Sequence, residues 1–205
     1  IQYLQVGTTN EYIEQVVSGN ITNADVHDIE IFWNYVVGAR EYELEWTWID
    51  NFGINGQEKP AGSITLTPQD FKLNNTRIRT KNHHYRIPAV FDNGYLIYRV
   101  RAIGKWSSTS SSDKFGPWSS DGGSKLFVSD WNPHTVKIGV NHQKLKNWQY
   151  QATYAEDGKR KDVVSYFDGS LRNRQTVTRM NSDNQAIVGE TIYDNQGRSV
   201  IQVLP

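Results

Sequence analysis

The feature that most constrains the fold is a regular spacing in the C-terminal part of the chain. Four large side chains recur at one constant interval, and each leads into a short polar turn: Tyr154, Phe167, Met180 and Tyr193. A strand of about eight residues followed by a turn of four or five residues gives this period. The spacing therefore predicts an up-and-down β-meander over residues 148–205.

The N-terminal half shows the alternation that is typical of half-buried strands. Apolar and polar side chains alternate strictly over residues 41–48, with Tyr42, Leu44, Trp46 and Trp48 set against Glu41, Glu43, Glu45 and Thr47. A second row over residues 96–102 places Arg99 and Arg101 opposite its apolar face. Two strands are predicted here, with the arginines pairing across strands with the glutamates. Shorter runs predict strands at 29–33 and 63–67.

A cluster of turn residues at 121–124 is the best candidate domain boundary, because the rhythm of the sequence changes after it. We therefore predict an N-terminal segment at 1–23, a β-sandwich at 24–122 and a β-meander at 123–205. Within the first segment, residues 3–6 suggest a short strand, and residues 11–17 fit a helix or a strand equally well. The 7 tryptophans and 11 tyrosines favour pleated, half-buried surfaces, so the predicted fold class is all-β.

Composition excludes several classes of function. The 205 residues include no cysteine, which rules out disulfides, thiol nucleophiles, Cys-ligated zinc and iron–sulfur clusters. Lys plus Arg and Asp plus Glu both number 22, so no overall basic field favours nucleic acid, and we predict no nucleic-acid partner. No run approaches the ~18 apolar residues of a membrane span.

The chain starts at Ile1 rather than Met and ends just after a strand signal, so we expect a piece of a longer protein.

Four short motifs within residues 24–122 have the order and spacing of a fibronectin type III domain. They are Phe32-Trp33, Glu41-Tyr42-Glu43-Leu44, Tyr98-Arg99-Val100-Arg101-Ala102 and Gly116-Pro117-Trp118-Ser119. The segment resembles that family, and the resemblance implies a two-sheet β-sandwich. One position departs from the family pattern: Leu96 replaces the tyrosine that usually makes a corner hydrogen bond.

Longer motifs mark the C-terminal part, at residues 147–149, 156–161, 165–175, 190–198 and 202–205. Residues 193–198, Tyr-Asp-Asn-Gln-Gly-Arg, carry the signature of a YD repeat. The segment resembles the region that leads into the Rhs, or YD-repeat, array of large surface and secreted proteins of Bacteroidetes-type bacteria.

This second resemblance implies a large β-rich protein whose repeats continue as an extended or hollow β-structure. In the wider family such shells often enclose a C-terminal toxin, and the shell itself is usually not an enzyme, although some relatives carry a protease that releases the toxin. The resemblance also implies an extracellular or cell-surface location and suggests type IX secretion as the export route.

Histidines and serines give no catalytic or metal-binding pattern. The five histidines, His27, His83, His84, His134 and His142, lack metal-ligand spacing, and the adjacent pair would point to opposite faces of a strand. The serines in the run at 107–112 lack a Gly-x-Ser-x-Gly elbow and predict a flexible loop, which leaves partner recognition as a second interpretation. We expect no metal, no cofactor and no catalytic residue.

Carboxylates present one superficial match to an enzyme. Glu41, Glu43 and Glu45 would share one strand face at about 7 Å spacing, which resembles a glycosidase pair. Catalytic carboxylates face each other across a cleft, whereas a row on one face is typical of a solvated strand surface. The sequence therefore predicts a non-enzymatic protein.

Two other charge patterns are explained by turns and edges. The acidic turns at 92–94 and 181–184 do not match a calcium loop, so we interpret them as turn chemistry. The basic residues of the meander interleave with acidic ones, which indicates a solvated sheet edge rather than a nucleic-acid patch. These residues are Lys159, Arg160, Lys161, Arg172, Arg174 and Arg179.

Trp106, Trp118 and Trp131 lie in or near predicted loops, where exposed tryptophans can stack on sugar rings. Trp118 matches a packing position of the fibronectin resemblance, which leaves Trp106 as the candidate ligand-binding residue. We predict a non-catalytic structural and interaction segment whose partners are downstream repeats and secretion machinery or a surface partner. The alternative is an adhesin module that binds carbohydrate or protein.

The last predicted strand, residues 199–204, carries apolar side chains on both faces. We therefore expect it to require a following partner strand, and to fray or to pair with another molecule when none is present.

Overall fold

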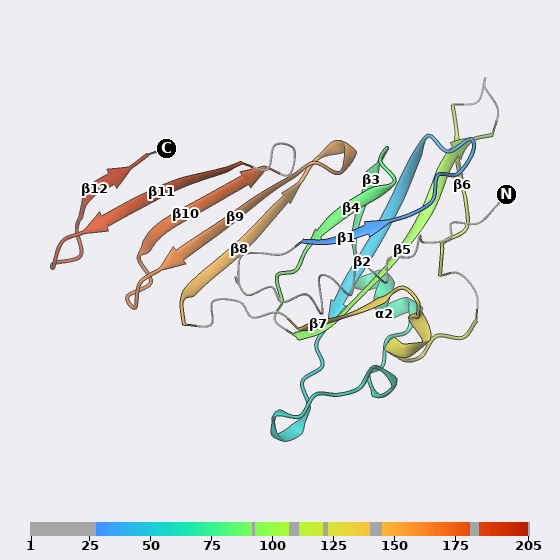
Figure 1. The fold of residues 1–205 in the computed structure, drawn as a ribbon, viewed down its shortest axis with the longest axis horizontal. Coiled ribbons are helices and arrows are strands. Elements are labelled where there is room, and N and C mark those ends of the chain that lie inside the picture. Colours follow the sequence, from blue (N-terminus) through green and yellow to red (C-terminus); the bar gives the residue numbers. More distant parts are fainter. Residues whose placement is uncertain are drawn as a thin grey trace. The chain divides into compact units, whose positions relative to one another are not determined.

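The computed structural model describes residues 28–91, 93–106, 111–120, 123–139, 145–180 and 185–204. The chain forms two compact units, unit 1 from Ile1 to His142 and unit 2 from Gln143 to Pro205. Strands dominate both units and pair antiparallel throughout the described sheets, which confirms the all-β class (Figure 1). The predicted N-terminal segment 1–23 lies outside the described residues.

Unit 1 contains two sheets. One pairs β1 (Asp28–Phe32) with β4 (His84–Pro88), and the other has the order β3 (Thr76–Thr80), β2 (Glu41–Ile49), β5 (Asn93–Lys105) and β6 (Asp113–Phe115). A further strand, β7 (Thr135–Gly139), also pairs with β5. The connections hold helix α2 (Pro68–Leu73) and the 3-10 helices η1 (Ile54–Gly56), η2 (Ala61–Ser63) and η3 (Val128–Trp131).

A core of aromatic and aliphatic side chains packs between the two sheets of unit 1. The ring of Trp33, just after β1, lies 5.6 Å from that of Tyr42 on β2. Trp46 of β2 lies 5.8 Å from Tyr85 of β4, measured between ring centroids. These contacts join the small sheet to the apolar face that the alternation predicts for β2.

The opposite face of the large sheet carries a second core. Here α2 and η3 cover the first half of β5, and the buried members are Ile64, Leu66, Phe71, Tyr95, Ile97, Val128 and Trp131. Both faces of the large sheet are therefore partly covered. As a consequence the central part of β2, from Tyr42 to Thr47, is buried at every position.

The predicted strand at 63–67 is wrong. Residues 61–63 form η2, Thr65 makes a single bridge to Phe127, and α2 begins at Pro68. Proline at the first helical position is pre-set for a helix. Thr67 caps this helix, because its hydroxyl accepts from the Asp70 amide while the Asp70 carboxylate accepts from the Thr67 amide.

The division between the units falls at residues 142–143, later in the chain than the boundary predicted at 121–124. The chain leaves β5 after Ser119, forms η3, and returns to the same edge of β5 as β7. Val128 and Trp131 meanwhile enter the second core. The glycine-rich turn thus begins an excursion within unit 1 rather than a linker between domains.

Unit 2 is a five-stranded antiparallel meander in the order β12-β11-β10-β9-β8, which confirms the up-and-down topology predicted from the spacing. Its strands begin at one constant interval along the chain: β8 (Asn147–Tyr154), β9 (Arg160–Phe167), β10 (Asn173–Met180), β11 (Ala186–Tyr193) and β12 (Ser199–Val203). A 3-10 helix, η4 (Glu156–Gly158), connects the first two strands. Every residue of the edge strand β12 is exposed.

Candidate functional site

An ordered array of charges crosses three strands on the outer face of the large sheet. Register places Glu45 between Arg77 and Arg99, and the next row places Glu43 between Arg79 and Arg101. We call these six residues the Arg–Glu lattice.

Both glutamates of the Arg–Glu lattice are saturated by arginines. The Nε of Arg77 donates to Oε1 of Glu45 at 2.5 Å, and the Nε of Arg99 donates to Oε2 at 2.6 Å. Arg101 donates to Glu43 Oε2 at 2.6 Å, and Arg79 donates to its Oε1 at 3.4 Å. The predicted pairing across strands is therefore confirmed.

Aromatic rings cover this lattice. The guanidinium of Arg99 lies 4.4 Å from the ring of Trp118 and 4.8 Å from that of Phe71. Arg101 lies 4.3 Å from both Trp118 and Phe115. Such contacts stabilise desolvated guanidiniums. Trp118 therefore fills a packing position, as its place in the fibronectin resemblance predicts.

The solvated face predicted for the glutamate row is wrong for two of its three members. Glu43 is 2% exposed and Glu45 is 0% exposed, because Trp118, Phe71 and the arginines close over them. Both oxygens of each carboxylate already accept from arginine, which leaves neither free to act as a nucleophile or a base.

Of the three histidines that the structure describes, one is buried. His134 lies 7% exposed against the edge of Tyr98, with 5.5 Å between ring centroids. Burial lowers its pKa from 6.5 to about 4, with a smaller contribution from the Lys125 charge. His134 is therefore neutral at pH 7 and serves as packing. His27 and His142 lie outside the described residues.

Two turns of the meander repeat the same side-chain bonds. The carboxylate of Asp168 accepts from the Ser170 amide and from the amide and Nε of Arg172. Asp194 accepts in the same way from the Gln196 amide and from the amide and Nε of Arg198. These bonds hold the pKa of each carboxyl below its usual value, chiefly through the arginine backbone amide.

These two turns also contact each other. Arg172 and Arg174 lie over the ring of Tyr193 at 5.1 and 5.6 Å, and the Tyr193 hydroxyl donates to the Asn173 carbonyl at 3.0 Å. A Cβ at Gly197 would collide with the Arg172 guanidinium. The aromatic residue Tyr193, which leads into the later turn, thus packs against the turn two strands earlier in the sheet.

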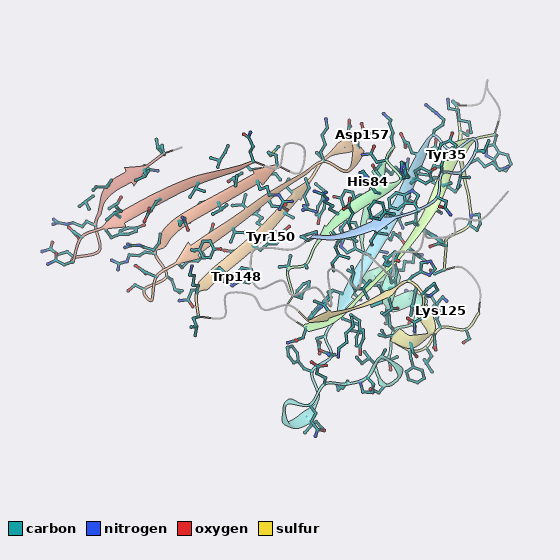
Figure 2. All side chains as sticks on the ribbon, viewed as in Figure 1. Tyr35, His84, Lys125, Trp148, Tyr150 and Asp157 are labelled. Atoms are coloured by element: carbon teal, nitrogen blue, oxygen red, sulfur yellow. The ribbon has the colours of Figure 1, made fainter. Side chains whose placement is uncertain are left out.

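Sequence patterns missed a buried polar cluster in unit 2. Arg160 is 1% exposed, and its Nε donates to Asp162 Oδ1 at 2.7 Å. The Tyr150 hydroxyl donates to the same oxygen at 2.6 Å, and burial raises the pKa of that phenol. Tyr150 and Trp148 both lie along β8 (Figure 2). Arg160 and Asp162 are two residues apart in a strand and so lie on the same face. This spacing was the sequence signal from which the ion pair could have been predicted.

The three loop tryptophans have different environments. Trp131 is buried, donates to the Leu66 carbonyl at 3.0 Å and stacks on Phe71, so it is unavailable to a ligand. Trp106 follows β5 and is 68% exposed, with the Lys114 ammonium 4.8 Å from its ring. The predicted candidate thus lies at the surface, beside a cation.

Within the described ranges, no three His, Asp or Glu side chains lie close enough to hold a metal ion. Asp92 and residues 181–184 of the acidic turns lie outside those ranges. Of the helices that the structure describes, none is long and apolar enough to cross a membrane. No family model, curated protein or solved structure matches the chain.

Proposed function

We propose that this chain is a non-catalytic structural and interaction segment of a large secreted or cell-surface protein of the Rhs/YD-repeat type. In this proposal unit 2 begins a repeat sheet, which can form part of a toxin-enclosing shell. Unit 1 is a fibronectin type III-like sandwich before it. The downstream repeats are its first partners, and secretion machinery or a surface partner is a second class.

One observation carries the proposal: the strands of unit 2 begin at a constant interval, and two of their turns contact each other across a pair of strands. Repeat proteins gain stability from such nearest-neighbour contacts. The sheet forms no buried apolar core among its described residues, and Ile187, Val188, Val200 and Ile201 are exposed. A sheet of this kind is completed by neighbours rather than by its own fold.

Strand order supports the fibronectin-like part of the proposal. The chain places β1 in the small sheet, β2 and β3 in the large sheet, β4 beside β1, and β5 and β6 in the large sheet again, as in sandwiches of the immunoglobulin-like class. Leu96, which stands at the family's corner-tyrosine position, is only 3% exposed and fills that place with an apolar contact.

The candidate catalytic side chains already contact other parts of the protein, which supports a non-catalytic role. Glu43 and Glu45 are bound by arginines, His134 is packed against Tyr98, and Asp168 and Asp194 hold their own turns. Each group therefore has a structural partner, whereas a catalytic group needs access to a substrate.

Insertion of a whole repeat tests this proposal. A second copy of residues 173–198 placed after Arg198 adds two strands in register, and the expected result is a longer sheet with newly protected amides. A matched control inserts residues 173–192 only, which breaks the period and should remove the pairing of β12 and the protection of its amides. Hydrogen exchange and far-UV circular dichroism measure both. Equal protection in the two variants, or no protection of the inserted strands, would contradict the repeat.

The alternative function is a carbohydrate-binding adhesin module, favoured by the exposure of Trp106. A glycan array probed with the wild-type protein and with Trp106→Ala separates the alternatives. Binding that is lost in the variant would establish the adhesin and contradict a purely structural role.

A further inference from the structure

Three connections of unit 1 meet at one end of the sandwich. The Arg40 amide donates to the Ile103 carbonyl at 2.8 Å, which joins the β1–β2 connection to the end of β5. The Trp33 amide donates to the His83 carbonyl at 2.9 Å, which joins it to the β3–β4 connection. Figure 1 shows the β1–β2 connection beside the β5–β6 end, and Figure 2 labels Tyr35 there. We call this region the loop end; its described residues are 33–40, 81–83, 106, 111 and 112.

Large apolar side chains are exposed at the loop end. Tyr35 is 69% exposed, Val37 is 91% exposed and Trp106 is 68% exposed. Tyr35 and Val37 come from the β1–β2 connection, and Trp106 directly follows β5. The β1–β2 connection touches the end of β5, since a Cβ at Gly104 would meet the Gly38 carbonyl oxygen at 2.9 Å.

The β1–β2 connection is held in place by hydrogen bonds. The Ala39 amide donates to the Val36 carbonyl at 3.0 Å, which closes a turn at Val37. The Val36 amide donates to the Tyr42 hydroxyl at 3.0 Å, and Tyr42 is a buried core residue. Because these bonds fix the turn before a partner arrives, binding there carries a small entropic cost.

Positive charge surrounds these apolar side chains. The cations near the loop end include Arg40, Lys105 and Lys114, and the nearby carboxylates are Glu41 and Asp113. Asp113 already pairs with Arg79 at 3.2 Å, which reduces its negative field. A surface of this sign steers and holds an acidic partner.

The opposite end of unit 1 provides a contrast. Phe52 and Ile54 are exposed there at 62% and 85%. Its charges are balanced, however, since Lys137 pairs with Glu58 at 2.7 Å and the same connection carries both Lys59 and Asp50. Apolar exposure therefore occurs at both ends, whereas the excess of positive charge distinguishes the loop end.

We infer that the loop end binds a protein segment in which acidic residues flank apolar side chains. Tyr35, Val37 and Trp106 would contact the apolar side chains, and the surrounding cations would pair with the acidic ones. Tyrosine and tryptophan anchors among serine, asparagine and glycine form a composition typical of protein-recognition loops. The inference deepens the interaction part of the proposed function by naming the surface and the chemistry of its partner.

A displayed library of random twelve-residue peptides tests the inference with the full 205-residue chain as bait. We expect enrichment of peptides with net negative charge and aromatic or aliphatic residues, whose binding weakens as salt increases. Trp106→Ala should raise the Kd of an enriched peptide about tenfold or more. Arg40→Ser should raise it less and should reduce the dependence on salt.

Phe52→Ser at the opposite end is the matched control and should leave the Kd unchanged. Circular dichroism confirms that each variant is folded. Enrichment of neutral or basic peptides, no enrichment, or equal binding to wild type and Trp106→Ala would overturn the inference. Glycan binding lost in Trp106→Ala would overturn it in favour of a sugar ligand. None of these outcomes depends on the insertion experiment in unit 2, so the repeat proposal and this inference fail separately.

Discussion

Replacing Glu45 by glutamine tests whether the Arg–Glu lattice is a buried structural element. The substitution keeps the size of the side chain and removes its charge. Glu45 is fully buried and accepts from two arginines, so the change leaves two guanidiniums facing a neutral amide. We expect the free energy of unfolding of unit 1 to fall substantially.

The size of the effect follows from the exposure of the two arginines. Removing one partner of a buried ion pair typically costs about 3–5 kcal/mol. The Arg99 side chain is 14% exposed and stays between Phe71 and Trp118, whereas the Arg77 side chain is 48% exposed and can regain water. The loss should therefore lie near the lower limit, about 3 kcal/mol.

Glu58→Gln is the matched control, because it makes the same chemical change in an ion pair whose two side chains are both 54% exposed. That pair should contribute only about 0–1 kcal/mol. Urea unfolding followed by tryptophan fluorescence reports mainly unit 1, which holds all of the 7 tryptophans except Trp148. Equal losses below about 1 kcal/mol in both variants would refute the burial argument.

Three further substitutions have defined outcomes. The pKa of His134 is about 4 in the folded protein and 6.5 in the unfolded chain. As pH falls, this imidazole is therefore protonated in the unfolded chain before it is protonated in the folded protein. Stability should drop between pH 6.5 and 4 by up to about 3 kcal/mol, and His134→Gln should flatten that part of the urea-midpoint profile. Gly94→Ala, at φ +125° against β2, should cost about 1–3 kcal/mol in urea unfolding, whereas Gly139→Ala in open space should cost far less. Asp194→Ala removes the bonds that close its turn, so hydrogen exchange should accelerate at Arg198 and along β12 but not in β8.

The meander was predictable because everything that specifies it is local. A strand, a turn with Asp and Gly, and an aromatic residue before the turn recur within one short window of sequence. The backbone repeats this faithfully, since the Asp168 amide donates to the Arg172 carbonyl and the Asp194 amide donates to the Arg198 carbonyl. Residues 199–203 form the exposed edge strand β12, and the expected fraying of this strand or its pairing with another molecule stays a prediction.

Elements that depend on distant contacts were missed. Helix α2 begins at Pro68, directly after a run that alternates like a strand. Its buried Phe71 packs on Trp131 of η3, which comes much later in the sequence. The division between the units falls later than the predicted boundary for the same reason, because the return of β7 to β5 has no local sign. A short stretch of alternation cannot identify which later segment will cover it.

The Arg–Glu lattice shows this limit most clearly. Strict alternation over residues 41–48 indicates one apolar face and one polar face, and the strand has both. Alternation does not reveal whether the polar face meets water, since that depends on Trp118 and Phe71, which come from other segments. The useful local sign was the matched charge on two strands, because arginines opposite glutamates can neutralise each other wherever the face lies. A polar strand face with a complementary partner strand and a nearby aromatic residue should therefore be read as a candidate second core before it is read as surface.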